Sequence, residues 1–330
     1  MSLFKSTFPI ILLLLISSCK TNPPNVNIEI VDTGKIFIQS NVDGASIFID
    51  NLNTGKVTPD TITAKVGNHK IRLEKSGYLP KEINVIVIKD STKNVEVLME
   101  VSSANKIALI EDFANVSCIP CVTSNKIIES LSKNRYGASK VLVIKYPTNF
   151  PSPNDPFYKA NKPDCDSRIR YYNIFATPTT IVDGIEKPIS TDSMDIISKI
   201  DQRLSLQPKF RITVKDTIVN LTLNIEITID VIDTTGISNK DILVHTVVTE
   251  KDIEFQTPPG SNGETKFFDI MRAMLPSSDG ETLNNLFPGS AINLQRQVNV
   301  NSSWNPDKLR TIIFIQNKNT KEIYQAVSDN

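Results

Sequence analysis

The stretch KIALIEDFANVSCIPC, residues 106–121, decides how the middle of the chain folds. Its first eight residues are mostly apolar without alternation, which indicates a strand buried on both faces. Cys118 and Cys121 follow, and beyond them apolar side chains recur at helical spacing up to residue 133. A cysteine at a helix N-terminus gains from the unpaired N–H groups and the helix dipole, so its thiolate is favoured. The pattern predicts Cys118 as a nucleophile and Cys121 as the residue that resolves a mixed disulfide.

Two later segments extend this pattern. Residues 140–145 (KVLVIK) read as a second strand, and Thr177-Pro178 stands directly before a third. The order of strand, cysteine pair, helix, second β/α unit and X-Pro before a strand resembles thioredoxin. The resemblance implies a thioredoxin-like α/β domain over residues 102–204.

The same resemblance implies roles for five residues. Cys118 and Cys121 form the redox disulfide, and Asp112 matches the buried acid that relays a proton to Cys121. Thr177 and Pro178 form a cis peptide that faces the cysteines and exposes backbone for pairing with a substrate peptide. These residues are the candidate catalytic residues.

Two departures favour a second interpretation. Ser117 stands where the thioredoxin pattern commonly has tryptophan, and a proline-rich loop at 146–156 could cover the site. The cysteine pair could therefore be a permanent structural disulfide that fixes the start of a helix.

The remaining composition predicts neither a cofactor nor a metal. Neither GxGxxG nor GxxxxGK[ST] occurs, and the chain has only two histidines. Cys165 could be a resolving partner, an intermolecular disulfide site or a small buried hydrophobe. A zinc site built on Cys118, Cys121 and Cys165 lacks an evident fourth ligand.

Charge argues against nucleic acid as a partner. The 330 residues contain 36 Lys and Arg and 36 Asp and Glu, so there is no basic excess to neutralise phosphates. The 40% hydrophobic and 22% charged residues are typical of packed domains.

The N-terminus predicts a lipid anchor. Residues 1–18 have a lysine followed by a nine-residue apolar run, too short to span a bilayer, which is typical of a signal peptide. The run ends in ISSC, which resembles the bacterial lipobox and implies lipidation at Cys19. An ordinary signal peptide with a chance cysteine is the alternative. Lys20 after the cysteine implies sorting to the outer membrane, and residues 19–33 read as a tether.

Residues 34–101 predict a small β domain. Short strand-like runs alternate with turns such as Asp43-Gly44 and Gly67-Asn68. The segment from residue 41 to residue 78 resembles the PEGA domain, an extracytoplasmic β-sandwich module. It is expected to serve as a spacer or a binding module.

Residues 205–330 predict an antiparallel β-sandwich. Residues 221–231 alternate apolar and polar side chains, further strand-like runs follow, and a long loop is expected over 251–290. Segments 111–113, 118–121, 271–276, 314–316 and 320–326 resemble a family of Bacteroidota envelope proteins named after a twenty-eight-kilodalton outer membrane antigen. The resemblance implies a thioredoxin-like domain joined to a β-sandwich.

Two functions follow as hypotheses. The first is thiol–disulfide exchange on exported proteins by a lipid-anchored outer-membrane protein, on its periplasmic or its surface face. The second is a non-enzymatic lipoprotein that binds protein or glycan through its β domains and keeps the cysteine pair as a structural disulfide.

Overall fold

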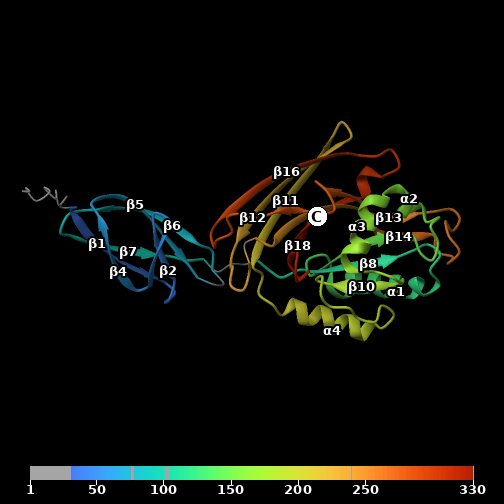
Figure 1. The fold of residues 1–330 in the computed structure, drawn as a ribbon, viewed down its shortest axis with the longest axis horizontal. Coiled ribbons are helices and arrows are strands. Elements are labelled where there is room, and N and C mark those ends of the chain that lie inside the picture. The colour runs from blue at the N-terminus through green and yellow to red at the C-terminus, as the bar shows by residue number, and fades with distance from the viewer. Residues whose placement is uncertain (1–30, 76–77, 101–103, 239, 330) are drawn as a thin grey trace, which may run out of the picture.

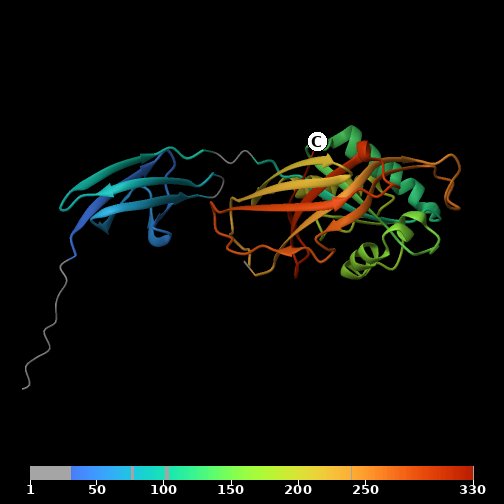
Figure 2. The same ribbon diagram turned by 90° about the horizontal axis from the view of Figure 1, so that it is seen from above.

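The computed structural model describes residues 31–75, 78–100, 104–238 and 240–329. The predicted signal peptide, the lipid-acceptor Cys19 and nearly all of the predicted tether lie outside these residues. Figures 1 and 2 show two parts along the long axis, a small one formed by residues up to 100 and a larger one from residue 104 onward. They are called the N-terminal module and the body below. Strands dominate both parts, so the chain is mostly β.

The N-terminal module consists of two small sheets that enclose an apolar core. One sheet has the order β4-β1-β7 and the other the order β3-β2-β5-β6. Two of the strands, β3 and β4, are absent from the sequence prediction because their short polar sequences read as turns. The strands are β1 (Thr33–Ser40), β2 (Ser46–Ile49), β3 (Leu52–Val57), β4 (Asp60–Lys65), β5 (Gly67–Glu74), β6 (Lys81–Val87) and β7 (Thr92–Val97).

The body is built on one mixed sheet with the order β10-β8-β9-β14-β13-β17-β18, to which β15 adds beside β13. Strands β8, β9 and β14 run parallel, whereas the pairs on either side of them are antiparallel. Its strands are β8 (Ala108–Ala114), β9 (Val141–Pro147), β10 (Thr179–Val182), β13 (Ile242–Glu254), β14 (Lys266–Leu275), β15 (Glu281–Thr282), β17 (Leu309–Asn317) and β18 (Ile323–Ser328).

Both faces of this sheet are covered. Helices α2 (Pro156–Ala160) and α3 (Lys162–Tyr172) pack on one face. On the other face, α1 (Ile119–Ser130), its continuation η1 (Leu131–Tyr136) and α4 (Ser193–Leu204) cover β8 and β9. Since both faces are buried, β8 and β9 are mostly apolar, and their charged residues Glu111, Asp112 and Lys145 are buried too.

A second sheet covers the rest of the face on which α1 and α4 lie. It has the order β11-β12-β16, and its alternating apolar residues pack against β13, β17 and β18. This packing confirms a β-sandwich in the C-terminal part of the chain. The elements not yet given are β11 (Phe210–Val219), β12 (Thr222–Val231), β16 (Ala291–Asn299) and the short helix η2 (Pro306–Lys308).

The prediction of one long loop over residues 251–290 is wrong. Residues 266–275 form β14, which lies inside the sheet between β9 and β13. The sequence FFDIMRAML lacks a two-residue alternation because most of this strand is covered on both faces. The predicted boundary at residue 204 falls at the end of α4, and strands from both sides of it share the eight-stranded sheet.

A buried ion pair joins α3 to this sheet. Arg168 and Glu111 are almost fully inaccessible, and Nη2 of Arg168 lies 2.5 Å from Oε1 of Glu111. Tyr172 donates to the same carboxylate and accepts a hydrogen bond of 2.7 Å from Gln316 of β17. Burial alone would lower the pKa of Arg168, but the charge of Glu111 outweighs it and raises that pKa. The guanidinium therefore stays charged and links α3, β8 and β17.

His245 is the buried histidine of the body, and it makes stability depend on pH. Its ring stacks on Phe314 at 4.7 Å, and burial, followed by the charge of Arg168, lowers its pKa well below the ordinary value. The folded protein keeps His245 neutral, whereas the unfolded chain takes up a proton below about pH 6.5. The stability that depends on neutral His245 is thus present above that pH and is lost as pH falls.

We therefore predict that acid destabilises the wild type more than His245→Leu. As the pH falls from 7 to 5, the wild type should lose more free energy of unfolding than the variant does. Below pH 6.5 this extra loss should reach up to about 1.4 kcal/mol per pH unit. Denaturant titrations followed by the fluorescence of Trp304, the single tryptophan, report on the body. Parallel pH profiles for the two proteins would contradict the prediction.

Candidate functional site

The cysteine pair lies where β8 leads into α1. Cys118 and Cys121 form a disulfide with an S–S distance of 2.05 Å. Cys118 is the N-cap of α1, and its Sγ accepts a hydrogen bond of 3.2 Å from the backbone N–H of Cys121. Both residues are buried, with Cys118 3% and Cys121 0% exposed. The disulfide is therefore closed to solvent in this conformation.

Asp112 lies on the face of β8 that packs towards α1. Successive side chains of a strand point to opposite faces, so Glu111 reaches Arg168 while Asp112 points the other way. The Asp112 carboxylate is 3.2 Å from Nζ of Lys145 on β9 and accepts a 3.0 Å hydrogen bond from the hydroxyl of Thr180 on β10. Lys145 was not among the predicted site residues. The sequence does carry a sign of it, because Lys145 directly follows the apolar residues of a strand expected to be buried.

Thr177 and Pro178 immediately precede β10. Their peptide bond is cis, and β10 pairs with β8 so that Thr180 stands opposite Asp112. Thr177-Pro178 therefore leads into the strand that pairs with the Asp112 strand. Their catalytic roles remain predictions.

The connection between β13 and β14, residues 255–265, covers the cysteine segment and is called the strap. The backbone N–H of Asn262 donates to the carbonyl of Val116 at 3.1 Å, and its side-chain amide donates to the carbonyl of Cys118 at 3.4 Å. A Cβ on Gly260 would lie 2.2 Å from the same Val116 oxygen, so only glycine allows this approach. Ser261 adds a hydrogen bond of 3.4 Å from its N–H to the hydroxyl of Ser117.

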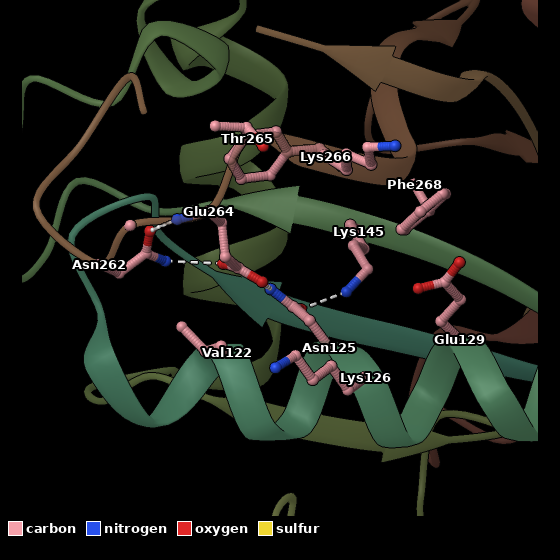
Figure 3. Close-up of a pocket in the computed structure, with 12 residues that line it drawn as sticks. Val122, Asn125, Lys126, Glu129, Lys145, Asn262, Glu264, Thr265, Lys266 and Phe268 are labelled. Atoms are coloured by element: carbon pink, nitrogen blue, oxygen red, sulfur yellow. Dashed lines mark hydrogen bonds between the residues drawn. The ribbon is translucent and has the colours of Figure 1, made fainter. Parts of the chain in front are cut away.

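Side chains extend the contact between the strap and α1. The Asn125 amide of α1 donates to both carboxylate oxygens of Glu264 at 2.9 and 3.0 Å, and Asn262 donates to the same carboxylate at 2.6 Å. The carbonyl of Asn125 in turn accepts from Lys145. Figure 3 shows this chain of polar groups running from the strap to β9. No feature of the local sequence around residues 255–265 marks them as part of the site.

The proline-rich loop contacts the same segment from the other side. Asn115 donates to the carbonyls of Thr148 and Ser152 at 2.7 and 2.9 Å, and Asp155 accepts from the N–H of Val116 at 2.9 Å. Burial raises the pKa of Asp155, although three backbone hydrogen bonds oppose the shift. The residues before Cys118 are thus held between this loop and the strap.

A cleft of about 430 Å³ opens between α1 and the strap (Figure 3). Ion pairs or hydrogen bonds within the protein already engage several of its charges: Lys145 binds Asp112, Glu129 binds Lys133, and Glu264 binds two amides. Residues that line it include Val122, Asn125, Lys126, Glu129, Lys145 and Phe268. Within the described part of the chain, no cluster of His, Cys, Asp and Glu could hold a metal ion.

Cys165, the remaining described cysteine, lies on α3 away from the disulfide. It is fully buried and unpaired, and burial raises the pKa of its thiol well above the ordinary value. A protonated thiol in an apolar core behaves as a small hydrophobe rather than as a nucleophile.

Residues 166–329 match the family described as outer membrane protein Omp28, and residues 33–102 match the PEGA domain. The chain resembles the Omp28 outer membrane proteins. The predicted resemblances to the PEGA domain and to this outer membrane protein family are confirmed, as is the predicted location in the outer membrane of the cell envelope. The thioredoxin-like domain over residues 102–204 stays a prediction. No curated protein matches the chain.

Solved structures extend the comparison. HBP35 of Porphyromonas gingivalis is 15% identical and superimposes with a TM-score of 0.55, covering 69% of this chain and 76% of its own. That similarity shows a shared fold. A domain of the outer membrane lipoprotein Omp28 from the same organism is 14% identical, with a TM-score of 0.27 over 37% of this chain and 86% of its own.

None of the helices in the described residues is both long enough and apolar enough to cross a bilayer.

The strap should control access to the disulfide. In Gly260→Val the strap cannot approach Val116, so its three hydrogen bonds to Val116, Ser117 and Cys118, worth about 0.5–1 kcal/mol each, are lost. Reduction by a small dithiol, followed by alkylation and mass spectrometry, should become on the order of 10- to 100-fold faster. Thr257→Val, an exposed position of the same strap, is the matched control. Equal reduction rates in the two variants would show that the strap does not shield the sulfurs.

Proposed function

We propose that this protein is a non-enzymatic outer-membrane lipoprotein, anchored through Cys19, that binds an exported protein or a glycan. The Cys118–Cys121 pair then serves as a structural disulfide. The observation that carries the proposal is the burial of both cysteines beneath the strap.

The burial matters because of how disulfides exchange. A thiolate must attack one sulfur directly, so at least one sulfur has to be reachable. Cys118 is 3% exposed, and its own carbonyl and the preceding Val116 are hydrogen-bonded to Asn262 of the strap. The disulfide also fixes the first turn of α1, which forms one wall of the cleft.

The cleft is the proposed ligand site. Its walls come from α1, β9, the strap and the start of β14. Because hydrogen bonds and ion pairs already engage much of its charge, the cleft favours neutral polar groups, such as hydroxyls or backbone amides, over a charged ligand. Phe268 and Val122 add apolar surface for the non-polar face of such a ligand.

Thiol–disulfide exchange is the second candidate function. The position of Cys118 at the N-cap of α1 favours it, because that position stabilises a thiolate. In this case Cys118 attacks, Cys121 resolves, Asp112 relays a proton, and Thr177-Pro178 pairs with the substrate backbone. Exchange then requires the strap to leave Cys118.

The reduction potential of the Cys118–Cys121 pair separates the two functions. For a structural disulfide we expect a value below about −300 mV, measured on the detergent-solubilised mature protein in dithiol buffers with alkylation and mass spectrometry. A value between about −120 and −270 mV, where known oxidoreductases lie, would overturn the proposal in favour of exchange. Cys165 in the same spectra is the internal control, because it should stay unpaired throughout.

A photo-crosslinking residue tests the cleft as the binding site. Placed at Lys126 on α1, it should capture a discrete envelope component in cells, because this position lines the cleft. The same residue at Lys187, which is exposed and does not line the cleft, is the control and should capture none. The same products from both positions, or none from either, would argue against binding in the cleft.

A further inference from the structure

Two side chains on the N-terminal module are buried where a small sheet alone would leave them in water. Along β5, Ile71 and Leu73 point into the core of the module, so Arg72 and Glu74 point outward. Nevertheless, Arg72 is only 4% and Glu74 only 8% exposed. A charged side chain is rarely buried unless a partner covers it. Another part of the chain must therefore cover this face.

The cover comes from the body, from the segment between β15 and β16. The Nη1 of Arg72 donates to the carbonyl of Pro288 at 2.7 Å. Its guanidinium lies 4.7 Å from the ring of Phe287 and 4.3 Å from the ring of Phe48 on β2. Arg72 thus touches one aromatic ring of its own module and one of the body, and it also pairs with Glu74.

The backbone beside these contacts approaches closely. A Cβ on Gly289 would lie 2.6 Å from the Cβ of Pro80, a residue of the module, and Gly289 has a φ of +90°. Next to the contact lies a cavity of about 350 Å³, lined by Glu74, Lys75 and Asp233 among others. The contacts of Arg72 with Phe287 and Pro288, and of Pro80 with Gly289, lie beside this cavity and join the module to the body.

We propose that Arg72 is a latch that holds the N-terminal module in one fixed orientation on the body. Domains with a small polar interface normally move relative to one another. A guanidinium that is desolvated between two rings and hydrogen-bonded to a backbone carbonyl opposes such motion, since any rotation would leave a buried charge without its partners.

The latch gives the module a mechanical role. Strand β1 begins at the end of the module that lies away from the body (Figures 1 and 2). A rigidly attached module therefore acts as a spacer of fixed length and direction between the incoming chain and the body. The cleft then keeps a fixed orientation relative to the N-terminal module, because the body cannot rotate freely about the segment that joins them.

Spin labels on both parts test the latch. Lys93→Cys on β7 and Lys215→Cys on β11 are exposed positions in the module and the body, and the described native cysteines are buried. In the full chain we expect a single narrow distance distribution. Arg72→Ala should broaden it about twofold or more, because the module is then free to rotate.

Phe287→Ala removes the contact from the body side and leaves the module's own residues intact, so it should broaden the distribution in the same way. The matched control is Lys70→Ala on the same strand, whose exposed side chain pairs with Glu82 within the module. It should leave the distribution unchanged. A wild type that is already broad, or a Phe287→Ala variant as narrow as the wild type, would overturn the proposal.

Discussion

A charged guanidinium inside an apolar interior constrains how the body is assembled. Arg168 lies among aromatic rings, and its charge is paired with Glu111 and hydrogen-bonded to Tyr172 and Gln316. These partners come from β8, α3 and β17, which are far apart in sequence. If one of them is misplaced, a charge is left buried without a partner, which typically costs about 3–5 kcal/mol. The α/β part and the sandwich are thus bound together through one polar network.

The cysteine segment is closed by the connection between β13 and β14, two strands of the shared sheet. This connection is the strap, which lies over the start of α1. The N–H of Asn262 in the strap donates to the carbonyl of Val116, and its side-chain amide donates to the carbonyl of Cys118. A cysteine pair at a helix N-terminus is chemically suited to exchange. In this protein the strap between β13 and β14 covers the pair, which favours a structural disulfide.

In the proposed function, the N-terminal module orients the protein and the body binds the ligand. The predicted lipid would hold the chain at the membrane, and the module latched by Arg72 would set the direction of the body. Within the body, the cleft between α1 and the strap offers polar walls whose charges are largely engaged already. Rigidity at each of these levels lowers the entropy lost when a ligand binds.

The sequence by itself determined the local elements and the compartment. Alternation and apolar runs predicted most strands, and the stretch around Cys118 and Cys121 predicted strand, cysteine pair and helix in the right order. It did not predict β14, because a strand buried on both faces has no alternation to recognise. Nor did it predict Lys145 or the strap as part of the site. Lys145 acts through Asp112 on the neighbouring strand, and the strap acts through contacts more than a hundred positions apart, such as Asn125 with Glu264. Only the tertiary structure decides such contacts, because no local pattern encodes which segments become neighbours.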